Sequence, residues 1–324
     1  MTDASPTASP TASATPSSEQ DSVIPPPSPQ GTGAGSVLAC IDDSPYAGAV
    51  CDFAAWSAER MTAPLTFLHV LDATSGNVPG SKNLSGAIGL GAREDLLEEL
   101  ADLDEARARL AMERGRQLLA AAVERVRAAT PALEAATGAI QVRQRHGELV
   151  DAILALESGV RMLVVGKRGT ASARRHGHLG RHLEEVIRAV QQPILVAQQS
   201  FAPPLRIMFA WDGSPTAQKG VRMIASGSLF RGIPCHLVHV GGERADIRRS
   251  LEAAAEALRD AGFEAPTAIV SGNPEDALPR YQLENGIDLL VMGAFGHSRL
   301  RRMILGSTTT AMLRTCTVSV MVLR

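Results

Sequence analysis

A glycine-spaced loop near the carboxyl end of the chain has the residues to bind an anion. Gly293 and Gly296 follow an apolar run, and nine residues later Gly306, Ser307 and Thr308 open a helical pattern. Glycines let backbone N–H groups approach an anion closely, and a helix N-terminus adds unpaired donors and the positive end of a dipole. The pattern predicts a phosphate-binding loop.

The interior of this loop is basic, which suits the same ligand class. It carries His297, Arg299, Arg301 and Arg302. The alternative is a structural connection that binds nothing.

Asp212 ends the first apolar run of the same region and is followed by Gly213 and Ser214. Ligands of an open parallel sheet bind beyond the carboxyl ends of its strands, so Asp212 is predicted to lie beside Gly293 if strands one and four are neighbours. A carboxylate repels phosphate, and it therefore suits the other end of the ligand, a base or a ribose. Capping of the next helix is an alternative and compatible role.

The elements that must position these residues occur twice in the chain. The run from Val37 to Pro45 matches the run from Ile207 to Pro215, and Leu68-His69-Val70 matches Val238-His239-Val240, both at an offset of 170 residues. Val164-Val165-Gly166 matches Val291-Met292-Gly293 at an offset of 127, so the first copy holds about 43 extra residues. His69 and His239, each near the end of a second strand, are expected to be structural.

Each copy alternates short apolar runs with helical periodicity, the pattern of βαβ units around a parallel sheet. Five strands per copy are predicted, and helix starts are predicted at Ser44-Pro45, Ser214-Pro215 and Asn273-Pro274 from the N-cap acceptor followed by proline. In the second copy the strands are predicted near Leu205–Ala210, Cys235–Val240, Thr267–Val270, Leu289–Met292 and Val318–Leu323.

The 324 residues suit two domains. Residues 1–35, rich in Ser, Thr, Pro and Ala, are predicted to be a disordered tail, and the proline pair of residues 200–204 to be a linker. We therefore expect domain 1 over residues 36–199 and domain 2 over residues 205–324, named below repeat 1 and repeat 2.

The Asp-Gly-Ser turn, the His-Val strand end and the glycine loop together resemble the ATP-binding class of the universal stress protein family, and both repeats share the resemblance. It implies two tandem α/β domains, each a five-stranded parallel sheet of order 3-2-1-4-5 in a three-layer sandwich like that of the adenine nucleotide α-hydrolases. Asp212 and Val240 then resemble adenine contacts, and the glycine loop resembles ribose and phosphate contacts. The full implied nucleotide site is Ala210, Asp212, Gly213, Ser214, Val240, Met292, Gly293, Gly296, His297, Arg299, Gly306, Ser307 and Thr308.

Repeat 1 departs from this pattern, because Arg181 stands where Ser307 stands and Asp43 where Gly213 stands. Arg181 could pair with a phosphate or fill the pocket, and we expect a degenerate site. Its remnants are Asp42, Val70, Gly166, Gly169, Gly180 and Arg181. His178 and His182 are four residues apart, but an exposed basic loop explains them as well as a metal does, so no metal is predicted.

A charged helix is predicted from Glu94 to Arg127, with leucines at helical spacing. This apolar face either packs on its own sheet or is partly available for dimerisation. The leucines are Leu96, Leu97, Leu100, Leu103 and Leu110.

Composition excludes several classes of protein. A net charge of −2 does not suit a polyanion partner, and four cysteines without a CxxC pair indicate reduced thiols. No window has the ~18 apolar residues that a membrane span needs, and no signal peptide is visible, so a cytoplasmic protein is expected.

The leading functional hypothesis is an ATP- or AMP-binding regulatory protein of the stress response, in which Mg²⁺ could accompany ATP. The chain has neither a GxxxxGK[ST] loop nor an SGGxDS-type loop, so an enzyme is not the first choice, although weak hydrolysis would fit. The alternatives are a nucleotide-hydrolysing or nucleotide-transferring enzyme and an interaction or chaperone-like module. Pairing of the two repeats through fifth strands such as Val318 to Leu323, a homodimer and an unknown protein partner are the expected associations.

Overall fold

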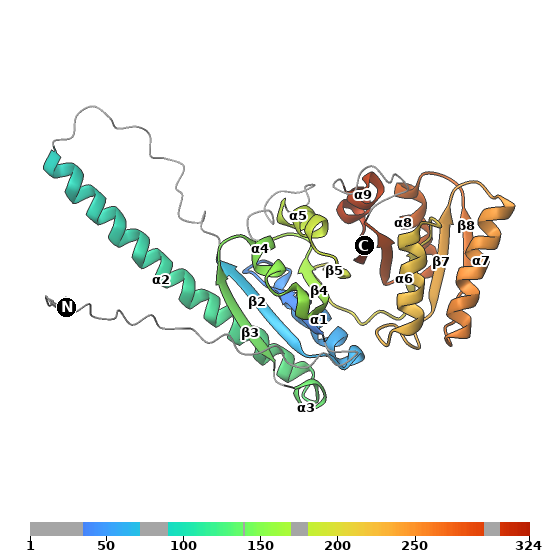
Figure 1. The fold of residues 1–324 in the computed structure, drawn as a ribbon, viewed down its shortest axis with the longest axis horizontal. Helices are drawn as coiled ribbons and strands as arrows, with labels where there is room; N and C mark the ends of the chain where they lie inside the picture. Colours follow the sequence, from blue (N-terminus) through green and yellow to red (C-terminus); the bar gives the residue numbers. More distant parts are fainter. Residues whose placement is uncertain (1–34, 72–89, 139, 170–180, 295–304) are drawn as a thin grey trace, which may run out of the picture. The chain divides into compact units, whose positions relative to one another are not determined.

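Two similar halves share one mostly parallel β-sheet in this computed structural model (Figure 1), which describes residues 35–71, 90–138, 140–169, 181–294 and 305–324. The described strands follow the order β3-β2-β1-β4-β5-β10-β9-β6-β7-β8. Read from its own first strand, each repeat therefore has the predicted order 3-2-1-4-5, and the predicted fold class is confirmed. The strands are β1 Ser36–Cys40, β2 Leu65–Leu71, β3 Gln141–His146, β4 Val160–Gly166, β5 Ile194–Ala197, β6 Ile207–Ala210, β7 Cys235–Val240, β8 Thr267–Val270, β9 Leu289–Gly293 and β10 Ser319–Leu323.

The fifth strands join the repeats. β10 pairs with β5 in antiparallel register, Met321 opposite Leu195, whereas the other strand pairs of the described residues are parallel. The predicted pairing of the repeats across this edge is therefore present. The division into two domains at residues 200–204 stays a prediction, because one sheet runs through both repeats.

Helices cover both faces of the sheet and give three layers (Figure 1). One apolar layer lies under α1, α2, α6 and α7, and the other under α4, α5, α8 and α9. Apolar side chains alternate between the two layers along the strands other than the exposed β3, as strand geometry requires. The helices are α1 Ala47–Met61, α2 Leu90–Ala129, α3 Leu133–Thr137, α4 Leu149–Leu154, α5 Arg181–Ala189, α6 Pro215–Ser226, α7 Ala245–Asp260, α8 Pro274–Asn285 and α9 Ser307–Thr315, with a short 3-10 helix at Glu157–Gly159.

The extra residues of repeat 1 include α2, which has 40 residues where α7 of repeat 2 has 16. Its inner part packs on β2, β3 and α1, with Leu119, Ala122 and Val126 buried. Its outer part, residues 99–110, is exposed at every position. The predicted helix is confirmed, and only its inner part packs on its own sheet.

The three predicted helix starts have different outcomes. Ser214 caps α6, since its hydroxyl accepts the N–H of Ala217 at 3.1 Å and Pro215 is the first helical residue. Asn273 precedes α8 and Pro274 begins it, but the Asn273 side chain makes no capping hydrogen bond.

The prediction at Ser44-Pro45 is wrong, because α1 begins at Ala47. The Ser44 hydroxyl accepts the N–H of Tyr46 at 3.3 Å, and the chain makes a turn before the helix. The cause lies one residue earlier. Gly213 of repeat 2 has a φ of +74°, while Asp43 in the same place is not among the positive-φ residues of the described chain. A residue with a Cβ disfavours that sharp entry.

Candidate functional site

The predicted site of repeat 2 lies where three neighbouring parallel strands end. β6 pairs with β7 on one side and with β9 on the other. Asp212, Val240 and Gly293 therefore come to the same edge of the sheet, as the sequence predicted for strands one and four. Ala210 and Val240 are half-buried at this edge, and Met292 is buried.

The turn after β6 is held by its own side chains. Asp212 Oδ1 accepts the N–H of Ser214 at 2.9 Å, so this carboxylate orders the entry to α6. The carbonyl of Trp211 accepts a hydrogen bond from Nδ1 of His239, 2.9 Å away, which ties the end of β6 to β7. His69 makes the same 2.9 Å contact with the carbonyl of Ile41 in repeat 1. Both histidines are thus structural, as expected. The two repeats share this hydrogen bond at equivalent positions.

The two ends of the glycine loop are held together. The Gly306 N–H donates to the carbonyl of Ala294 at 3.1 Å, and the Thr309 hydroxyl donates to the carbonyl of Gly293 at 2.9 Å. The strand end and the start of α9 therefore sit side by side. Thr309, which is only 3% exposed, was not among the residues predicted for the site. Its position on the first turn of α9, two residues after Ser307, was the available signal.

The N-terminus of α9 has no side-chain cap. Gly306 is the N-cap residue, and it has no side chain to bond the first-turn N–H groups. Ser307 is exposed and Thr308 is half-exposed on that turn. A helix start of this kind offers N–H groups and a positive dipole end to an anion. The predicted residues Gly296, His297 and Arg299 lie outside the described residues.

Repeat 1 has the same framework, and side chains pack closely against the glycines of its predicted site. A Cβ added at Gly166 would lie 2.8 Å from Cβ of Tyr46, and one added at Gly169 would lie 2.9 Å from Oδ2 of Asp42. Tyr46 is buried, whereas the equivalent residue of repeat 2, Thr216, is half-buried. Val70 is half-buried at the end of β2. Gly180, His178 and the Arg181 side chain lie outside the described residues.

Lys167 follows Gly166, and its side chain reaches across the junction to repeat 2. Its Nζ donates to the carbonyl of Cys316, at the carboxyl end of α9 in repeat 2, at 3.0 Å. Lys167 is 8% exposed, and burial lowers the pKa of its ammonium group. The Lys167 ammonium group thus binds the carboxyl end of α9 in the other repeat, where the negative end of the helix dipole stabilises it.

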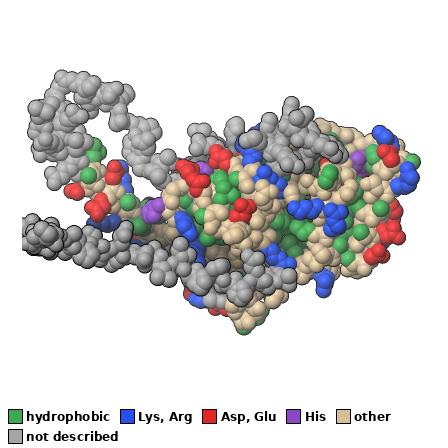
Figure 2. Space-filling view, in the orientation of Figure 1, with side chains coloured by type: hydrophobic (Ala, Val, Ile, Leu, Met, Phe, Trp, Pro, Cys, Tyr) green, Lys and Arg blue, Asp and Glu red, His purple; other side chains and the backbone are tan. Residues whose placement is uncertain are grey.

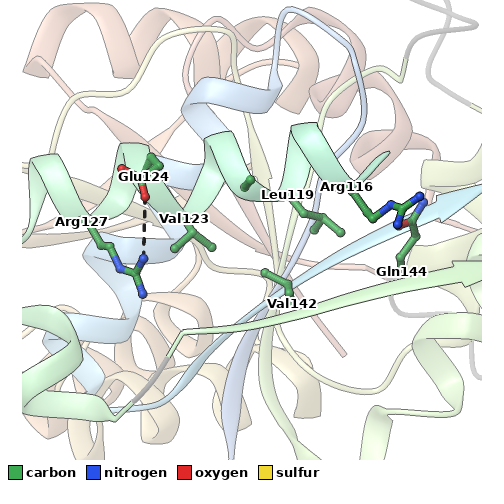
Figure 3. A pocket seen from close by; sticks show the side chains of 8 residues that line it. Arg116, Leu119, Val123, Glu124, Arg127, Val142 and Gln144 are labelled. Atoms are coloured by element: carbon green, nitrogen blue, oxygen red, sulfur yellow. Dashed lines mark ion pairs between the residues drawn. The ribbon is translucent and has the colours of Figure 1, made fainter. Parts of the chain in front are cut away.

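A groove formed by described residues lies away from the predicted site. It has a volume of about 340 Å³ between α2 and β3, with Leu119, Val123 and Val142 on its apolar surface (Figure 3). Its arginines face acidic partners, since Arg127 pairs with Glu124 and Glu134 and Arg116 pairs with Glu113. The groove contains none of the predicted site residues.

The described residues form neither a metal-binding cluster nor a membrane-spanning helix. No group of three or more His, Cys, Asp or Glu side chains in that part of the chain could hold a metal ion. No described helix is both long enough and apolar enough to span a membrane.

A sequence profile of the universal stress protein family matches residues 34–198 and 241–324. The chain belongs to the universal stress protein family. Its similarity to universal stress protein Slr1230 of Synechocystis is 35% identity over 291 residues, covering 89% of this chain and 99% of that protein.

Solved structures show the same fold. A universal stress protein from Archaeoglobus fulgidus matches with a TM-score of 0.62 at 20% identity, covering 89% of this chain and 96% of that one. A functionally unknown protein from Pseudomonas aeruginosa matches with a TM-score of 0.54 at 16% identity, covering 90% and 92%. This universal stress protein therefore shares its tandem architecture with proteins of similar length.

Proposed function

We propose that this universal stress protein binds one adenine nucleotide, ATP or AMP, in repeat 2 and acts as a regulatory protein of the stress response. The uncapped start of α9 beside Gly293, held by Thr309, carries the proposal. In it, the first-turn N–H groups, Ser307 and Thr308 bind the phosphates. Asp212 and Val240 bind the base and ribose from the neighbouring strand ends, with the remaining predicted residues around them.

Repeat 1 is proposed to be a degenerate site. Tyr46 packs against Gly166, Asp42 approaches Gly169, and Lys167 is committed to Cys316. Each of these contacts uses space or charge that a nucleotide would need. One nucleotide per chain is therefore the proposed stoichiometry.

The proposal extends to the setting of the protein. Mg²⁺ accompanies ATP, since the phosphates themselves supply its ligands. We place the protein in the cytoplasm, with the linker at residues 200–204 between two domains, and a second chain as well as an unknown protein as its partners. Its role is binding rather than turnover.

Isothermal titration of the full chain with ATP, ATP with Mg²⁺, and AMP tests the site. We expect one site per chain. Ser307→Ala should weaken ATP binding by at least tenfold, because a hydrogen bond to a charged group contributes ~1.5–3 kcal/mol and each ~1.4 kcal/mol is a factor of ten. Gly306→Val should abolish it, since the branched side chain blocks the approach of phosphate. The backbone at Gly306 has a φ of −59°, which valine also adopts, so the backbone conformation does not oppose this substitution.

Thr315→Ala, at the other end of α9 and exposed, is the matched control and should bind as the wild type does. Unchanged ATP binding in both loop variants would exclude this site. Steady ATP turnover that is lost on substitution of Asp212 would instead make the protein an enzyme.

A further inference from the structure

The outer part of α2 is an amphipathic helix without a sheet beneath it. Every residue from 99 to 110 is exposed, and three of the seven large exposed hydrophobic residues of the described chain lie there. Leu100, Leu103 and Leu110 are 46%, 46% and 51% exposed. Their spacing of three and seven residues places them on one face of the helix. Figure 2 shows hydrophobic and acidic side chains together on this part of the molecule.

This segment has little to stabilise it within its own chain. Two ion pairs along the helix, Arg107 with Asp104 and Arg109 with Glu105, are exposed and contribute little. A helix of this length is marginal in water without a packed face. Three exposed leucines on one stripe indicate a contact surface rather than a solvated one.

The charges on α2 specify what could cover the stripe. Six of the residues 94–104 are acidic and none is basic, while residues 106–116 hold four arginines and one glutamate. The centre of this arrangement is Glu105. A second α2 laid antiparallel about Glu105 would place each acidic half against the other's basic half. A parallel arrangement would oppose like charges and is disfavoured.

The same register also aligns the leucines. With Glu105 at the two-fold axis, Leu100 of one chain lies opposite Leu110 of its partner, and Leu103 lies opposite the aliphatic stem of Arg107. Charge and apolar contact therefore agree on one alignment. An isologous contact of this kind closes at two chains.

We propose that two chains of this protein pair through the outer halves of their α2 helices, antiparallel about Glu105. The contact is separate from the β5–β10 junction, which is already filled within each chain. It also leaves the proposed nucleotide site of repeat 2 untouched. The partner is a second copy of this chain.

Sedimentation equilibrium of the full chain over a wide range of concentrations tests the proposal. We expect the wild type to approach twice the 34.1 kDa of one chain. Leu100→Gln with Leu103→Gln and Leu110→Gln should raise the dimer dissociation constant at least tenfold. Leu205→Gln with Leu283→Gln, the leucines of repeat 2 that are 73% exposed, is the matched control and should leave it unchanged.

Charge reversal provides a second variant that does not alter the apolar stripe. Arg107→Glu with Arg109→Glu should also abolish the dimer, with the helical circular dichroism signal retained. A wild type that stays monomeric at every concentration would overturn the proposal, and so would a dimer that both sets of variants leave intact.

Spin labels report the direction of the pairing. Labels at Ala106→Cys, which is exposed beside the leucine stripe and one residue from the two-fold axis, should be close together, whereas labels at Arg116→Cys should lie about 33 Å apart along the helix axis, from a rise of about 1.5 Å per residue. Native thiols compete little, since three are buried and one is half-buried. A short distance at both positions would indicate parallel pairing and refute the proposed contact.

Discussion

Two buried thiols should make this protein lose stability above pH 9. Cys51 of α1 and Cys235 of β7 are 3% and 0% exposed. Burial raises the pKa of each thiol from 9.0 to about 12, and the charge of Asp52 adds to the effect at Cys51. Because each thiol has a higher pKa in the folded protein than in the unfolded chain, its contribution to the free energy of unfolding is fully present below pH 9. It is then lost as the pH rises from 9 toward 12, because only the unfolded thiols release protons.

The loss of unfolding free energy at pH 10 is set mainly by ionisation of the thiols in the unfolded chain. One pH unit above a pKa of 9.0, ionisation stabilises each unfolded thiol by ~1.4 kcal/mol, while a folded thiol with a pKa near 12 is still protonated. Both thiols together should remove about 3 kcal/mol of unfolding free energy between pH 8 and pH 10. Cys51 lies in repeat 1 and Cys235 in repeat 2, so each half should lose about half of this amount.

Urea unfolding of the reduced protein at pH 8 and pH 10, followed by circular dichroism, measures the loss. Cys51→Ala with Cys235→Ala is the comparison. The cavities that alanine leaves cost the same at both pH values, and titration of other groups is common to both proteins. The wild type should lose about 3 kcal/mol more than the double variant between the two pH values. An equal loss in both proteins would refute the reasoning.

Two further substitutions test the packing that positions the site. Gly220→Ala should destabilise the protein by ~1–3 kcal/mol in urea unfolding. Its Cβ would lie 2.5 Å from a leucine methyl group of β10 and 2.8 Å from a phenylalanine ring atom of β6. Gly242→Ala, where a Cβ meets nothing within 4 Å, should change stability little, and an equal effect of both would contradict this account. Thr309→Val should cost about 1 kcal/mol by leaving the Gly293 carbonyl without its hydroxyl donor, and should weaken ATP binding more than Thr310→Val does.

The sequence predicted the framework of this protein because its signals are local and repeated. Strands such as β7 and β8 begin and end at the predicted residues, since each is an apolar run between breaking residues. The repeat at an offset of 170 residues is enough to establish that Asp42 and Asp212 are equivalent. The order of strands followed from the family resemblance and not from these patterns.

Contacts made across the fold escaped prediction for a physical reason. The Thr309 hydroxyl reaches Gly293 only after α9 folds back on β9, and a threonine in a helix gives no sign of its acceptor. The start of α1 at Ala47 depends on the backbone angles at Asp43, which the Ser-Pro pair does not reveal. The nucleotide residues between 295 and 304 lie outside the described residues and stay predictions.

The junction of the repeats is nearly symmetric. Gln198 and Arg324 follow equivalent fifth strands, and each donates to a helix-end carbonyl of the other repeat. Gln198 Nε2 lies 2.7 Å from the carbonyl of Cys316, and Arg324 Nη1 lies 3.2 Å from the carbonyl of Val190. Helix ends accept such donors because their last carbonyls lack partners within the helix.

Lys167 breaks this symmetry, because its equivalent in repeat 2 is Ala294. Both residues donate their backbone N–H to the last strand of their own repeat, at 3.0 Å and 2.8 Å. Only the lysine has a side chain that crosses the junction, where it joins Gln198 at Cys316. Ala294 has no side-chain donor and makes no such contact. At this position, the Lys167 side chain of repeat 1 therefore contacts repeat 2, whereas Ala294 of repeat 2 makes no side-chain hydrogen bond to repeat 1.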